Sequence, residues 1–170
     1  NAIISIITNN PSGALYKALV ETKLSTSVYG YTITLKDPAF SYFACEIAKD
    51  KDINTVQKAF LETMNSVPQM TFTEEDLKRA KNELLKQFEN TYNKTINLSV
   101  ALTEFVGAGD WRLFFIDRDN IEALTVADLQ NAAKKYYLQS NRTWGRFIPE
   151  ATSERTKVGE TKDVAALVKG

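Results

Sequence analysis

Histidine is missing from all 170 residues, and only one cysteine, Cys45, is present. Histidine is the commonest metal ligand in proteins and the usual general base near neutral pH. Without it, this chain cannot assemble a standard zinc site or a nucleophile–histidine pair of its own. A single thiol also excludes an internal disulfide. We therefore expect no catalytic, cofactor or metal site within these residues, and no catalysis by the chain unaided.

An excess of charge and long apolar runs are missing as well. The 21 basic residues balance 21 acidic ones, so charge gives no reason to expect nucleic acid or an anionic membrane as a partner. The longest apolar runs, such as Leu113 to Ile116, are far too short to cross a bilayer. Because the first residue is Asn and no signal peptide is visible, we expect a segment of a longer protein.

The N-terminal region of the sequence has helical spacing. Residues 2–8 are apolar enough to form a buried helix or strand. After a break at residues 9–11, Ser12 is a plausible N-cap for a helix. That helix places Leu15 and Leu19 on one face because they are four residues apart.

The next segments have the period of β-strands. Residues 27–36 alternate between two faces, and residues 40–47 resume an extended pattern after a turn at residues 36–38. This arrangement predicts an antiparallel hairpin. On the first strand we expect the face with Tyr29 and Tyr31 to be buried, the hydroxyls reaching the rim. On the second, Cys45 is predicted to be a small core residue and not a reactive thiol.

A run of helices follows, and two of them have clear N-terminal signals. Thr73 with Asp76, and Thr125 with Asp128, have the spacing of capping boxes. The expected helices are residues 53–67, ended by Pro68, then 74–92, 96–106, 111–124 and 126–136, followed by a short strand at residues 142–148. This order predicts an α+β fold, an antiparallel sheet with helices layered on one face. We expect residues 1–150 to form one domain and residues 151–170 a linker toward a following domain.

Three groups of residues could be mistaken for functional sites. The acidic residues 74–76 occupy the first turn of a helix, where negative charge stabilises the helix dipole. Residues 117–119 are interpreted as a solvated helix face. Gly107 and Gly109 lack the spacing and the preceding strand of a phosphate loop, so they are expected to end a helix.

Four segments together resemble a known family. They are residues 12–21, 109–115, 117–128 and 140–150. In their order and spacing they are similar to the noncatalytic domain of bacterial zinc proteases of the pitrilysin and insulysin family. These proteases are inverzincins, and their relatives include mitochondrial processing peptidase. The resemblance covers nearly the whole chain through Glu150.

The resemblance implies a division of labour between domains. In that family, homologous α+β domains pair around a closed chamber, and the first domain carries the HxxEH motif and a later Glu that bind zinc. This chain would then be the second domain, with zinc in the preceding domain, homologous domains of the same parent as partners and peptide as the substrate. Val20 and roughly Thr26 stand where the family's last domain often has a substrate-binding Arg and Tyr, so no catalytic residue is carried over. A bacterial periplasmic or envelope location is also implied.

The family's domain normally opens with a strand that precedes residues 1–8. If that strand is missing, the sheet has an unpaired edge, and we expect the isolated fragment to self-associate.

Three functions remain open from the sequence. The first is a noncatalytic, chamber-forming domain of a zinc-dependent metalloendopeptidase. The second is a scaffold domain of a family member that has lost its metal site. The third is an unrelated interaction module that docks a partner through the apolar stretch at residues 111–116.

Overall fold

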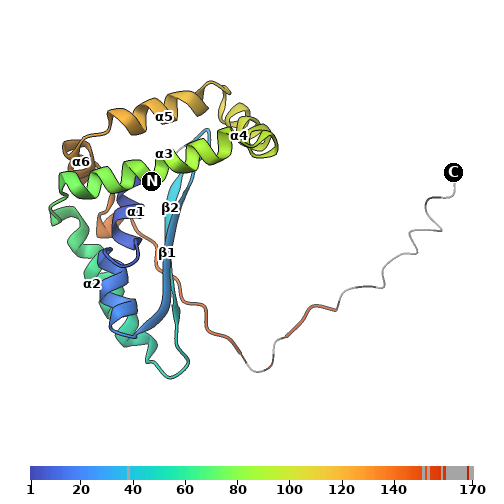
Figure 1. The fold of residues 1–170 in the computed structure, drawn as a ribbon. Coiled ribbons are helices and arrows are strands. Elements are labelled where there is room, and N and C mark those ends of the chain that lie inside the picture. Colours follow the sequence, from blue (N-terminus) through green and yellow to red (C-terminus); the bar gives the residue numbers. More distant parts are fainter. Residues whose placement is uncertain (38, 151, 153, 158, 160–167, 169–170) are drawn as a thin grey trace.

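The computed structural model describes residues 1–37, 39–150, 152, 154–157, 159 and 168. Helices cover one face of an antiparallel hairpin (Figure 1), which confirms the predicted α+β class with helices layered on one face. The helical elements in chain order are α1 (Ala2–Thr8), η1 (Tyr16–Glu21, a π-helix), α2 (Ile53–Ser66), η2 (Val67–Gln69), α3 (Glu74–Tyr92), α4 (Thr95–Ala108), α5 (Leu113–Ala123), α6 (Val126–Tyr136) and η3 (Gln139–Asn141). None of the helices in this part of the chain is long and apolar enough to span a membrane.

The hairpin consists of β1 (Ser25–Ile33) and β2 (Phe40–Ile47). Its register pairs Ile33 with Phe40 and Val28 with Cys45, with an irregularity between Ser25 and Ser27. The predicted second strand has the observed bounds, whereas β1 begins and ends earlier than the predicted 27–36. Pro38 of the predicted turn lies outside the described residues.

The prediction for the buried face of β1 is wrong. Tyr29 and Tyr31 are 45% and 47% exposed, and Tyr42 on β2 lies beside them, with ring centroids 5.1 Å apart between Tyr31 and Tyr42. The opposite face packs on the helices through Val28 and Gly30. The prediction assumed that the face with the aromatic residues is the buried one. The buried face is instead the one with Gly30, because a residue without a side chain allows α1 to approach the sheet closely.

Residues 2–8 form a helix, and the turn after it does not use Ser12 as an N-cap. The Ser12 hydroxyl donates to Oδ1 of Asn9 at 3.2 Å, and the carbonyl of Gly13 accepts the Lys17 N–H at 2.9 Å. A Cβ on Gly13 would lie 2.6 Å from the carbonyl oxygen of Ile7. The turn therefore folds back onto the end of α1, and Ser12 stabilises the turn instead of the next helix.

Both predicted capping boxes are present. The Asp76 N–H donates to the Thr73 hydroxyl oxygen at 3.1 Å, and the Thr73 N–H donates to the Asp76 carboxylate at 3.0 Å. Thr125 and Asp128 repeat the arrangement at 3.2 and 2.9 Å. These reciprocal bonds satisfy two N–H groups that have no partner within the helix, and so they fix the starts of α3 and α6.

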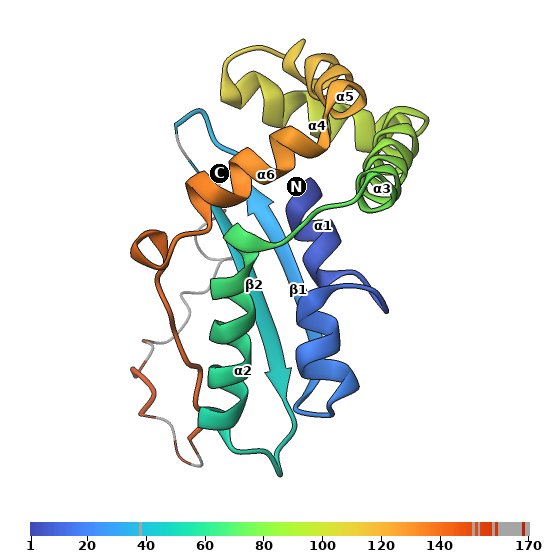
Figure 2. The same ribbon diagram turned by 90° about the vertical axis from the view of Figure 1, so that its left-hand side faces the viewer.

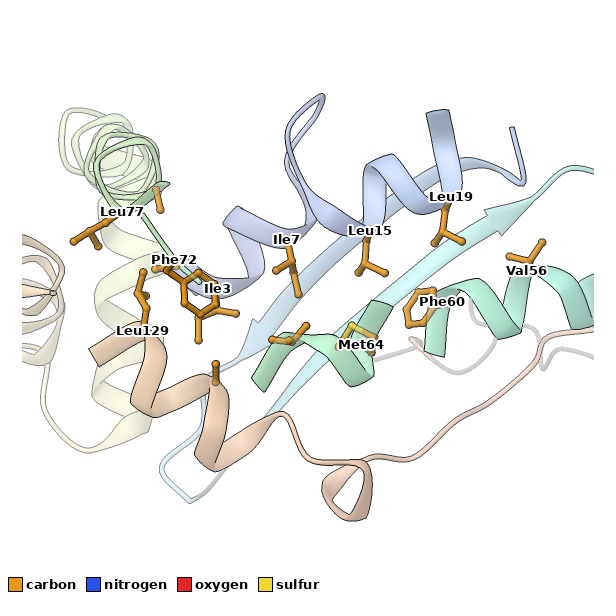
Figure 3. Close-up of a cluster of buried hydrophobic side chains, with 14 residues drawn as sticks. Ile3, Ile7, Leu15, Leu19, Val56, Phe60, Met64, Phe72, Leu77 and Leu129 are labelled. Atoms are coloured by element: carbon orange, nitrogen blue, oxygen red, sulfur yellow. The ribbon is translucent and has the colours of Figure 1, made fainter. Parts of the chain in front are cut away.

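The hydrophobic core lies between the sheet and the helices (Figures 2 and 3). α1, η1 with the residue before it, α2 and η2 supply its largest fully buried side chains, and α3 and α6 close its other end. The largest fully buried side chains are Ile7, Leu15, Leu19, Val56 and Val67.

The predicted strand at residues 142–148 is also wrong, because this segment pairs with no strand in the described part of the chain. A strand needs a neighbouring strand for its backbone hydrogen bonds, and here alternate side chains attach the segment to α2 instead. We call residues 142–146 the strap. Its contacts are Arg142 Nη2 to Asn65 Oδ1 at 2.8 Å, the Trp144 and Phe60 rings at 5.2 Å, and Arg146 Nη1 to Asn54 Oδ1 at 3.1 Å.

Most of the residues expected to form a linker, 151–170, lie outside the described part of the chain.

Candidate functional site

The acidic residues are distributed among separate structural roles. Within the described residues, no three acidic or cysteine side chains come together in a group that could hold a metal ion. Asp76 is tied to Thr73 in the capping box and to the guanidinium of Arg79. Burial raises the pKa of Asp76, but the Thr73 bonds and Arg79 together outweigh it and leave that pKa lowered. This carboxylate is therefore held ionised as part of a helix cap.

Two ion pairs between neighbours in the sequence lie at the start and in the middle of α5, and the exposed Asp117 belongs to neither of them. The Asp110 carboxylate accepts the Arg112 Nε–H at 2.9 Å, and that guanidinium lowers the pKa of Asp110 to about 2. Arg118 donates to Asp119 at 2.9 Å and lies 5.7 Å from the Phe88 ring. Exposed pairs of this kind contribute little to stability, and they offer no free group for chemistry.

The remaining sequence candidates have structural roles. Cys45 is partly buried against the core, and burial raises the pKa of its thiol, which confirms it as a small core residue. Gly109 has φ 129° at the C-cap of α4, a conformation that favours glycine, whereas Gly107 lies inside that helix. The expected helix end is thus confirmed at Gly109 alone.

A cavity of about 270 Å³ opens where the start of β2, the end of α2 and the end of α6 meet. Figure 2 shows α6 ending beside the start of β2, with η3 and the strap turning away below it. The lining residues are Ala39, Phe40, Ser41, Phe43, Met64, Tyr136, Tyr137, Leu138, Asn141 and Arg142.

The polar side chains of this cavity carry no negative charge. Arg142 lines it, and one of its amino groups is held by Asn65. The Tyr137 ring packs edge-on against Phe43 at 6.0 Å, and burial raises the pKa of Tyr137 to about 12, although the Ser41 hydroxyl acts in the opposite direction. The cavity therefore combines one cation, three hydroxyl-bearing residues (Ser41, Tyr136 and Tyr137) and the amide of Asn141 with apolar side chains.

Sequence reasoning missed this cavity. Its residues come from three separate parts of the sequence, residues 39–43, Met64 and residues 136–142, and none of them belongs to a recognisable motif. Phe40, Met64, Tyr136 and Arg142 were placed in predicted strands and helices, but nothing in the sequence brought them together. The one useful signal is that no acidic residue lies beside Arg142 in the cavity. The sequence alone does not show this, because the neighbours of Arg142 are known only once the chain is folded.

A second notable feature is exposed apolar surface on α4, α5 and the hairpin. α4 has no buried residue, although its sequence is mostly apolar. Trp111, at the start of the stretch considered as a docking surface, is 50% exposed, and Phe115 is partly buried against it. The exposed large residues on these elements are Ile96 (79%), Val100 (57%), Val106 (60%) and Ile116 (48%), together with Tyr29, Tyr31, Phe40 and Tyr42 on the sheet. Such area is typical of surfaces that meet other domains or proteins.

The described residues thus form an α+β domain with exposed apolar surface, and they contain no cluster of acidic or cysteine side chains that could hold a metal ion. Residues 1–84 match the sequence family described as the Peptidase M16 inactive domain. The chain is 36% identical to a candidate zinc protease from Bordetella pertussis Tohama I, with a TM-score of 0.81, 87% of this chain covered and 82% of the other. The inactive peptidase domain of a candidate zinc protease from Bordetella parapertussis gives 36% identity, a TM-score of 0.83 and coverage of 92% and 84%. The chain belongs to the M16 peptidase family and is one of its inactive domains.

More distant structures share the fold alone. A protease from Helicobacter pylori is 15% identical with a TM-score of 0.72, and this chain covers 34% of it. A chain of the dimeric complex III from Candida albicans is 17% identical with a TM-score of 0.65, again with 34% of that chain covered. In both, the fold is one part of a much longer chain. No curated protein sequence matches this chain.

Proposed function

We propose that this chain is the noncatalytic domain of a zinc-dependent metalloendopeptidase whose HxxEH site lies in another domain. The proposal depends on one combined observation: the chain is an inactive M16 domain, and its sequence contains no histidine. Such a domain contributes chamber wall and support, while the domain with HxxEH supplies the zinc, the nucleophilic water and the general base.

The exposed apolar surfaces support an assembly with other domains of the same parent. α4 has no buried residue in the described fold, and Ile96 on it is 79% exposed. Placing Ile96 and its neighbours against a partner domain removes this area from water, at about 25 cal/mol per Å² buried. We propose that the occupant is a homologous M16 domain, because the Helicobacter pylori protease, which shares this fold, is about three times the matched length.

The test is an assay of the purified 170-residue chain for zinc content after dialysis and for hydrolysis of a quenched-fluorescence peptide library. The proposal predicts neither bound zinc at stoichiometric level nor hydrolysis that depends on added zinc. Appreciable zinc-dependent hydrolysis by the chain alone would overturn it.

A scaffold role in a family member without a zinc site is the second candidate. It is supported by the fold shared with a chain of complex III, a likeness of fold alone at 17% identity. The discriminating observation is the coding region adjoining this chain. An HxxEH motif followed by a later Glu supports the peptidase, whereas an M16 domain without that motif supports the scaffold.

A further inference from the structure

The cavity at the end of α6 has the composition of a small binding site. Its walls include Phe40, Phe43 and Met64, and its one charged lining residue is Arg142. The ion pairs of the described residues do not include Arg142, and none of the lining residues is acidic. An anion that enters such a site meets a cation in partly apolar surroundings, where charge-assisted hydrogen bonds are stronger than in water.

The guanidinium is also positioned in advance. Asn65 accepts a hydrogen bond from one amino group of Arg142 at 2.8 Å, and the strap holds the backbone beside α2 through Trp144. The other N–H groups of the guanidinium remain available in a planar fork that matches a carboxylate. Fixing the side chain before the ligand arrives lowers the entropy cost of binding.

A further positive charge lies beside one of the lining residues. Lys135 lies 5.0 Å from the ring of Tyr136, which lines the cavity, and Lys134 precedes it in the last turn of α6. These lysines also offset the partial negative charge of the helix C-terminus, which would otherwise oppose an anion.

We propose that this cavity binds a carboxylate attached to an apolar group, with Arg142 pairing the carboxylate and Phe40 and Phe43 enclosing the apolar part. Its volume of about 270 Å³ lies just below the usual range of ligand pockets, roughly 300–1,000 Å³. The cavity therefore accommodates one aromatic or aliphatic acid, or a single acidic residue with its neighbour, and not a nucleotide cofactor. The site does not depend on the proposed peptidase function.

The simpler explanation of Arg142 is that it only fastens the strap to α2. Arg146 provides the matched comparison, because it belongs to the same strap and donates to Asn54 of α2 at 3.1 Å in the same way. Arg146 does not line the cavity. Any effect of Arg142 on binding that Arg146 does not share therefore belongs to the cavity.

The experiment is an NMR titration of ¹⁵N-labelled 170-residue protein with 3-phenylpropionate in the millimolar range. The neutral analogue 3-phenylpropionamide and inorganic phosphate serve as comparison ligands. The proposal predicts saturable shifts at cavity residues with the acid, and affinity weaker by at least about tenfold for the amide and for phosphate. Equal binding of all three ligands, or no saturable shift with the acid, would overturn it.

Variants locate the site. R142Q is expected to weaken binding of the acid by about tenfold or more, and R146Q to leave it unchanged. A39W adds bulk to an exposed lining residue, so it tests the cavity even if R142Q fails to fold, and it is expected to abolish binding with the fold retained. Binding that survives A39W, or that R146Q weakens as much as R142Q, contradicts the proposal.

Discussion

Gly30 determines which face of the hairpin is buried. A Cβ at this position would lie 2.9 Å from Cγ2 of Ile4 on α1 and 2.9 Å from Cδ1 of Phe43 on β2. Real Cβ atoms do not approach other atoms so closely, so a side chain here would push α1 away from the sheet. The absence of a side chain, and not the apolar character of its neighbours, therefore sets the packing of β1.

Gly30→Ala is expected to lower the free energy of unfolding by about 1–2 kcal/mol, because the added methyl overpacks the contact with α1. The measurement is chemical denaturation followed by circular dichroism. The control is Gly145→Ala, since a Cβ there meets nothing within 4 Å. Equal stability of the two variants would show that α1 does not pack on Gly30 as described.

The Cys45 thiol is expected to react slowly. Burial raises its pKa, with a smaller opposing effect from the Ser25 hydroxyl. Because this pKa is raised in the folded state, the fraction of thiolate at pH 8 is smaller in the native protein than in the unfolded chain. This difference disappears as the pH rises through the folded-state pKa. Iodoacetamide modification of native protein should be slower than that of denatured protein at pH 8; equal rates would contradict the burial.

At the scale of single elements, the helix starts are the features that local sequence determines most directly. Thr73 with Asp76 and Thr125 with Asp128 were predicted from three-residue spacing, and both form reciprocal caps. The caps are local because each joins residues within one turn of the chain. The same reasoning failed at Ser12, where contacts between the turn and α1 decide the geometry.

Thr73→Ala is expected to destabilise the protein by about 1 kcal/mol, the usual loss for a helix cap. The pKa of Asp76 is lowered in the folded state, so its contribution is present above the unfolded-state pKa and is lost as the pH falls through the folded-state value. The difference between wild type and variant should therefore be larger at pH 6 than at pH 2.5. Ser99→Ala, on the exposed surface of α4, is the control and should be near neutral. A difference that does not shrink in acid would contradict this account of the cap.

Sequence patterns predicted the positions of the hairpin and of most helices well, but they did not predict which elements pack against one another. Periodicity places β2 and α2 within a residue or two because it depends on spacing along one segment. The strand expected at residues 142–148 did not form, since a strand requires a partner and the strap instead attaches to α2. The cavity beside Tyr137 was unpredictable for a related reason, as it exists only where three distant segments meet.

At the scale of the whole molecule, the domain leaves much apolar surface uncovered. In the described part of the chain, β1 and β2 pair only with each other, so each has an open edge. The outer face of this hairpin carries Tyr29, Tyr31 and Tyr42, all more than 40% exposed. A domain with open strand edges and an apolar outer face is suited to contact with other domains, and it is prone to pair with itself.

We expect the isolated chain to self-associate in the micromolar range, as measured by sedimentation velocity. Tyr42→Lys places a charge on the outer face of β2 and should shift the equilibrium toward monomer if the hairpin is the contact. Val100→Lys on α4 is the matched comparison and should have the smaller effect. A monomer throughout the concentration range would contradict the prediction.

The most direct test of the central claim is reconstitution. This chain is assayed for zinc-dependent peptide hydrolysis alone, and then mixed with a purified HxxEH-bearing domain from the same protein. The account predicts no hydrolysis by this chain, weak hydrolysis by the HxxEH domain alone, and a strong increase when the two are combined. Hydrolysis by this chain alone, or an HxxEH domain whose activity is unaffected by it, would contradict the account.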